Sequence, residues 1–111
     1  MNAIDFRCGR YQDVLQDVTC DALICDPPYS EKTHAGRRTG TDIRQSNLTY
    51  QHITEAGAQE LASFWRDRCR WWAIIFCDHT AFRCHETAWL AMGWYVFGPV
   101  YWVKPNGSPR Y

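Results

Sequence analysis

The sequence has no excess of charge of one sign, because Lys and Arg number 12 and Asp and Glu also number 12. The chain as a whole therefore produces no basic field that would attract nucleic acid, and any such attraction must come from local clusters. It also has no apolar run long enough to cross a bilayer. Its first residues lack the basic-then-apolar order of a signal peptide, which predicts a cytoplasmic protein without membrane contacts.

The sequence lacks the paired glycines that form a tight turn around a nucleotide-like cofactor. None of the seven glycines has a partner two residues away in a Gly-x-Gly turn. The six cysteines are expected to be reduced thiols and small buried hydrophobes, as is usual in a cytoplasmic protein. No internal repeat is present, and 111 residues suit one compact domain over 1–111.

The apolar pattern alternates between strand and helix. We expect strands at 2–7, 21–25, 71–77 and 94–103, and helices at 11–16, from Thr54 to about Arg68, and at 80–92. Thr54 and either Asp78 or Thr80 are the expected helix caps, and Gly93 is the expected stop. This alternation predicts an α/β fold with a mostly parallel sheet and helices on both faces.

The segment Asp26-Pro27-Pro28-Tyr29 directly follows the predicted strand 21–25, where ligands of open α/β sheets bind. The Asp26 carboxylate and the Pro27 carbonyl could accept the two N–H groups of an exocyclic amine and free its lone pair for attack on a methyl group. Pro27 and Pro28 stiffen the turn and remove competing donors. Tyr29 offers a flat face on which a base taken out of a duplex can stack. The simpler alternative is a strand ended by proline, with Asp26 as a cap.

These residues resemble motif IV of the N6-adenine and N4-cytosine DNA methyltransferases. The apolar strand before Asp26, the strand that ends near Asp78, and the Trp102-Val103-Lys104 ending resemble further parts of that family. The motif order is similar to the class in which the catalytic region comes before the cofactor region.

The resemblance implies a partial Rossmann-like methyltransferase sheet and S-adenosylmethionine as the cofactor. It implies a flipped DNA base as substrate, with adenine N6 preferred because the motif begins with Asp26. The family's Phe-x-Gly-x-Gly turn is missing from 1–111, so we expect this chain to be the catalytic portion only. A second polypeptide segment would then supply the cofactor motif.

Other candidate sites surround this motif. Asp26 and Asp78 are candidates for cofactor contact, and Asp78 is alternatively a candidate helix cap. The polar stretch 30–53 and the end of the last strand carry cationic side chains that could contact DNA phosphates, although solvated polar positions are an equal reading. These candidate DNA-binding residues are Lys32, Arg37, Arg38, Arg44 and Lys104.

Three alternatives to an autonomous DNA methyltransferase stay open. The chain could be an inactive fragment or a DNA-binding partner subunit, or it could methylate RNA or a protein amide. It could also be a small zinc-binding module, because Cys77, His79, Cys84 and His85 lie close together in the sequence. Their spacing matches no usual finger, and core cysteines with surface histidines are the preferred reading. The tryptophans at 65, 71, 72, 89 and 94 are expected in the core.

Overall fold

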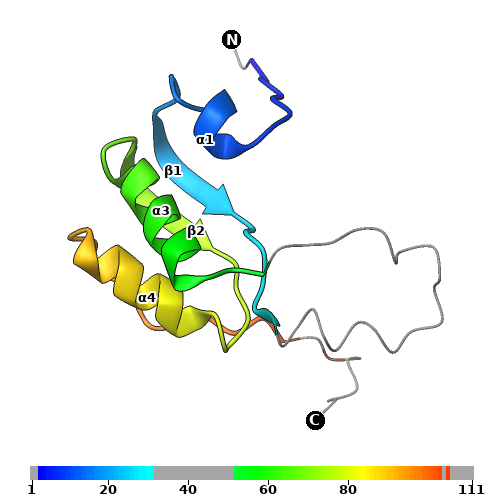
Figure 1. Cartoon of the computed structure of the whole chain (residues 1–111), viewed down its shortest axis with the longest axis vertical. Coiled ribbons are helices and arrows are strands. Elements are labelled where there is room, and N and C mark those ends of the chain that lie inside the picture. The colour runs from blue at the N-terminus through cyan, green and yellow to red at the C-terminus, as the bar shows by residue number, and fades with distance from the viewer. Residues whose placement is uncertain (1–2, 32–51, 104, 106–111) are drawn as a thin grey trace, which may run out of the picture.

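The computed structural model describes residues 3–31, 52–103 and 105. The described elements follow the chain in the order α1 (Tyr11–Val14), β1 (Cys20–Cys25), α3 (Glu55–Arg66), β2 (Cys69–Ile75) and α4 (Phe82–Ala91) (Figure 1). This order confirms the predicted α/β class. Each of the two strands is followed by a helix that packs on the sheet.

The two strands pair in parallel and form a two-stranded sheet. Leu23 lies opposite Ala73 and Cys25 lies opposite Ile75, after an irregularity between Cys20 and Ala22. A parallel pair needs a long crossover, and α3 lies within it. Because the strands run in the same direction, their carboxyl ends lie at the same edge of the sheet.

Helix α3 begins where the sequence predicts. The Thr54 hydroxyl oxygen accepts a hydrogen bond from the Gly57 backbone N–H at 3.0 Å, which satisfies one of the free donors of the first turn. The buried side chains recur at helical spacing and form much of the core: Ala58, Leu61, Ala62 and Trp65. The helix ends at Arg66, two residues before its expected end, and Cys69 begins β2.

Helix α4 ends at the predicted glycine. Gly93 has φ +84°, a left-handed conformation that favours glycine. Its N–H bonds to the Leu90 carbonyl, and the Trp94 N–H bonds to the Trp89 carbonyl, which together make a Schellman motif. The rings of Trp89 and Trp94 meet edge to face with centroids 5.0 Å apart, so the turn also closes one end of the core.

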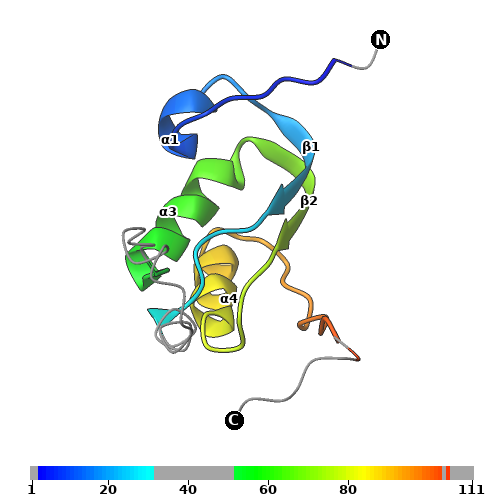
Figure 2. The same ribbon diagram turned by 90° about the vertical axis from the view of Figure 1, so that its right-hand side faces the viewer.

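The helices lie on one face of the sheet (Figure 2). Leu23, Cys25, Ala73 and Ile75 face the core between the sheet and the helices. The opposite face has no helix among the described residues, so the expected helices on both faces are not found there. Side chains on this face are apolar and largely exposed: Ile24 at 71%, Trp72 at 60%, Ile74 at 51% and Phe76 at 41%. Phe97 contacts this face, because its ring stacks on that of Trp72 with centroids 5.7 Å apart.

Two predicted strands are wrong. The described part of 2–7 and the segment 94–103 are extended but form no strand. Their large side chains are exposed, such as Phe6 at 91% and Val100 at 97%. An apolar pattern alone does not create a strand, because a strand needs a neighbour with which to bond. Core positions for Trp71 and Trp72 are likewise wrong, since both side chains are exposed, whereas Trp65 and Trp89 are buried.

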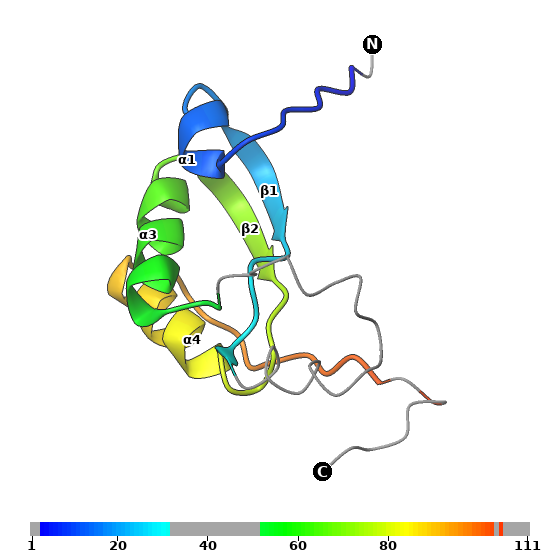
Figure 3. The same cartoon turned by 45° about the vertical axis from the view of Figure 1, so that its right-hand side comes forward.

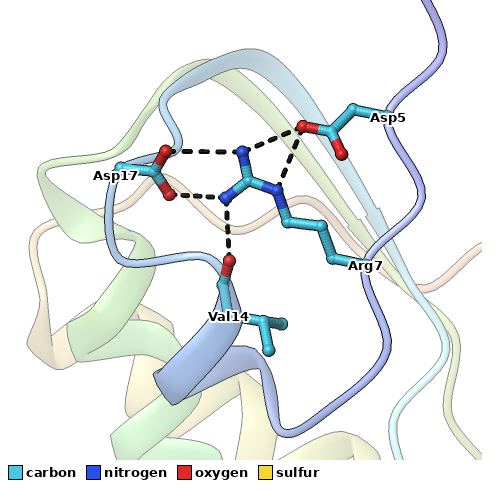
Figure 4. A network of polar contacts seen from close by, with 4 residues as sticks. All are labelled: Asp5, Arg7, Val14 and Asp17. Atoms are coloured by element: carbon cyan, nitrogen blue, oxygen red, sulfur yellow. Dashed lines mark hydrogen bonds and ion pairs between the residues drawn. The ribbon is translucent and has the colours of Figure 1, made fainter.

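The N-terminal segment is held by Arg7 (Figure 4). The guanidinium donates to the Asp5 carboxylate, to both oxygens of Asp17 and to the Val14 carbonyl. Hydrogen bonds with Asp17 and Asp5 raise the pKa of Arg7, and the bond to Arg7 lowers the pKa of Asp17. Gly9 makes this path possible, because it has φ +146° and a Cβ there would lie 2.6 Å from Val14 Cγ1.

Replacing Thr54 by alanine should lower the free energy of unfolding by about 1 kcal/mol, because a cap oxygen on a core helix is lost. Urea unfolding followed by circular dichroism measures this change. Thr54→Ser keeps the oxygen and should match the parent. Thr80→Ala should also be neutral, since no backbone N–H of α4 bonds to Thr80 among the described contacts. Equal stability of Thr54→Ala and Thr54→Ser would contradict the role of the cap.

Candidate active site

The segment Asp26–Tyr29 lies directly beyond the carboxyl end of β1, as predicted. Pairing continues one step past the strand, because the Phe76 N–H donates to the Cys25 carbonyl at 2.9 Å. Figure 3 shows the segments that follow β1 and β2 running on beyond the strand ends toward the start of α4. The parallel sheet therefore brings the residues after Cys25 and the residues after Ile75 to one place.

The segment Asp26–Tyr29 forms a corner between β1 and the chain that follows it. Two contacts fix the Tyr29 end of this corner. The Tyr29 carbonyl accepts a hydrogen bond from the Ile53 N–H at 2.9 Å, just before the Thr54 cap of α3. The Asp78 Oδ2 atom accepts from the Ser30 N–H at 3.0 Å and from the Ser30 hydroxyl at 2.5 Å. Ser30 itself is buried, with 7% of its surface exposed. The corner is thus tied to α3 and to the segment before α4.

The groups that would act on a substrate are accessible. Asp26 is exposed, and Pro27 and Tyr29 are half-buried. Among the described residues, no donor bonds to the Pro27 carbonyl. Burial, the negative charge of Asp26 and a hydrogen bond from the Tyr29 hydroxyl to the Asp26 carboxylate raise the pKa of Tyr29 above its usual value, so the phenol is neutral at pH 7. An acidic acceptor and a neutral aromatic ring therefore stand side by side.

Asp78 caps the turn that leads into α4. Its Oδ1 atom accepts from the Ala81 N–H at 2.7 Å, and its carbonyl accepts from the Phe82 N–H. Asp78 thus caps the turn that precedes α4, whereas the N-cap of α4 itself is Ala81, which makes no side-chain cap bond. The expected N-cap of this helix at Asp78 or Thr80 is therefore wrong. The contact from Asp78 to Ser30 was not expected. Its sequence signal is a serine and an aspartate that follow two neighbouring parallel strands.

The thiols beside the corner are not activated. Burial raises the pKa of Cys25 and of Cys77, and the charges of Asp26 and Asp78 respectively raise these values further. All six cysteines are free, as predicted, although Cys8 is exposed and only Cys69 is buried. Since thiolates are the reactive form, neither Cys25 nor Cys77 is suited to act as a nucleophile at neutral pH.

The predicted DNA-contacting cations, Lys32, Arg37, Arg38, Arg44 and Lys104, lie outside the described residues. Cys77, His79, Cys84 and His85 are described. Within the described part of the chain, no three His, Cys, Asp or Glu side chains are grouped so that they could hold a metal ion. Nor does any described helix have the length and apolar character needed to cross a bilayer.

Comparison of the chain with models of protein families, with curated proteins and with solved structures finds no match.

His85 is buried on α4, with 4% of its surface exposed. Neither ring nitrogen has a hydrogen-bond partner among the described residues. Burial lowers the pKa of His85, and the charge of Asp78 opposes that shift. The imidazole is therefore held neutral in the folded chain at neutral pH.

Acidification should destabilise the fold through His85. The unfolded chain binds a proton near the ordinary pKa of about 6.5, whereas the folded chain binds it only at lower pH. The stability linked to His85 is thus present above about pH 6.5 and is lost as the pH falls, by at most about 1.4 kcal/mol per pH unit. Urea midpoints between pH 7.5 and 5.5 measure this loss. His85→Leu should flatten the profile, and an unchanged slope in that variant would contradict the assignment.

Proposed function

We propose that this chain provides the catalytic corner of an S-adenosylmethionine-dependent methyltransferase that acts on the exocyclic amine of a DNA base. One observation supports the proposal above all others. The accessible carboxylate of Asp26, a Pro27 carbonyl without a described donor and the half-buried ring of Tyr29 follow one strand, at the sheet edge where α/β folds bind ligands.

The chemistry that the corner suits is activation of a weak nucleophile. The lone pair of an aromatic amine is delocalised into the ring. Two acceptors, Asp26 and the Pro27 carbonyl, would each take one N–H and draw the nitrogen toward tetrahedral geometry. Charged acceptors make the stronger hydrogen bonds, which explains why one of the two is a carboxylate.

Tyr29 has the matching role for the ring of the base. Stacking of a base on an aromatic side chain is worth about 1–3 kcal/mol. The Tyr29 backbone is held through Ile53 on one side and through Ser30 on the other, so its ring is presented on a fixed support. Preorganised groups of this kind lower the cost of orienting a substrate.

S-adenosylmethionine, when bound, would supply an electrophilic methyl group on a sulfonium sulfur. The described residues fit the target-base half of this reaction. They do not fit the cofactor half, because the chain has no Gly-x-Gly turn to hold the methionine part. The role of Asp26 in cofactor binding stays a prediction.

Adenine N6 is the proposed target, because the motif that this corner resembles begins with aspartate in the adenine enzymes. The proposed DNA contacts at Lys32, Arg37, Arg38, Arg44 and Lys104 would be phosphate contacts. They would position the duplex without reading its sequence.

In the chain joined to the segment that supplies the cofactor motif, replacing Asp26 by alanine should lower transfer of a tritiated methyl group from S-adenosylmethionine to duplex DNA about a hundredfold or more, similar to the loss of one preorganised hydrogen bond at a reacting centre. Scintillation counting of recovered DNA measures this transfer. Asp21→Asn is the matched control, because Asp21 is also exposed but lies at the opposite end of β1. Unchanged incorporation by Asp26→Ala would rule out the proposed mechanism.

A second candidate function is supported by the sheet face that no described helix covers. Sheets of parallel strands are normally covered on both faces, and the exposed Ile24, Trp72 and Ile74 are apolar. A subunit that binds the base but needs another polypeptide to bind the cofactor would have an exposed apolar surface of this kind. Methylation by the isolated chain would contradict this candidate. An isolated chain that binds DNA but transfers no methyl group would favour it over an autonomous enzyme.

A further inference from the structure

We infer that Asp78 is a positioning residue of the proposed site, which acts on the base-binding corner through Ser30 and makes no contact with cofactor or base. The inference rests on the proposed function. It deepens that function by assigning a role to the neighbouring strand end. Ser30 and Asp78 are 48 residues apart in the chain, and they meet only because β1 and β2 are parallel neighbours.

The contact involves more than a single hydrogen bond. One carboxylate oxygen of Asp78 receives both the backbone N–H and the hydroxyl of Ser30, while the other receives the Ala81 N–H at the start of α4. Because both the N–H and the hydroxyl of Ser30 bond to Asp78, they fix the orientation of the Ser30 backbone as well as its distance from Asp78. The residue held in this way is the immediate neighbour of Tyr29.

Burial strengthens the link. Ser30 is 7% exposed and Asp78 is half-buried, so water competes weakly for these hydrogen bonds. Breaking the link would leave a buried N–H and a buried hydroxyl without acceptors, which is unfavourable. The corner should therefore keep one orientation as long as the Asp78 carboxylate is intact.

The two roles of Asp78 can be separated by substitution. Asparagine is as good a helix cap as aspartate, so Asp78→Asn can keep an oxygen toward Ala81. Its amide nitrogen then faces the Ser30 N–H, and two donors cannot bond to each other. Ser30→Ala removes the hydroxyl from the other side of the link and leaves the cap untouched.

The first measurement is methyl transfer by the parent chain, Asp78→Asn and Ser30→Ala, each joined to the segment that supplies the cofactor motif, with S-adenosylmethionine and DNA varied separately. We expect kcat to fall about tenfold to a hundredfold in Asp78→Asn, because misplaced reacting groups slow the chemical step. The KM for S-adenosylmethionine should stay unchanged. Thr80→Ala, an exposed neighbour, is the matched control. The double variant should be no slower than the worse single variant, because both changes break one link.

A raised KM for S-adenosylmethionine with an unchanged kcat in Asp78→Asn would show a cofactor contact and would overturn the inference. Parent-like kinetics in both single variants would overturn it as well. Additive losses in the double variant would also contradict a shared link.

The second measurement does not depend on activity. Hydrogen exchange at the Ser30 amide should accelerate in Asp78→Asn and stay slow in Thr80→Ala. An unchanged exchange rate at Ser30 in Asp78→Asn would show that Asp78 does not hold the corner. If the parent joined to its cofactor segment transfers no methyl group while its exchange pattern is as expected, the proposed function is contradicted and Asp78 is left as a residue that only fixes the conformation of the corner.

Discussion

The parallel pairing of β1 with β2 is the constraint on which the site depends. Its register sets Cys25 opposite Ile75 and then adds the bond from the Phe76 N–H to the Cys25 carbonyl. The segments that follow β1 and β2 therefore leave the sheet side by side. An antiparallel pair would send the two continuations to opposite ends, and Ser30 would never meet Asp78. Core packing by α3 and α4 keeps the pair together from one side.

Much of the fold could be predicted from local sequence signals. Caps and stops are local chemistry, so Thr54 and Gly93 were placed correctly. The apolar runs that became β1 and β2 also have neighbours in the fold. The segments 2–7 and 94–103 have the same apolar character, yet they form no strand among the described residues. Strand formation depends on pairing with a distant segment, and the residues of one segment alone do not show whether such a partner exists.

In the site, too, local features could be predicted and long-range contacts could not. The corner at Asp26–Tyr29 could be located because its chemistry lies in four consecutive residues. The link between Ser30 and Asp78 could not be found from either residue alone, because its distance in sequence is large and its distance in space is set by the strand register. The cationic residues proposed to contact DNA lie outside the described residues, and their role stays a prediction.

The bond between the Tyr29 carbonyl and the Ile53 N–H has a consequence for how the protein can change in evolution. Ile53 directly precedes Thr54, the cap of α3, so the corner and the first turn of that helix share one point of attachment. A substitution that shifts the first turn of α3 would therefore also move the Tyr29 backbone. The helix start and the corner can change only together.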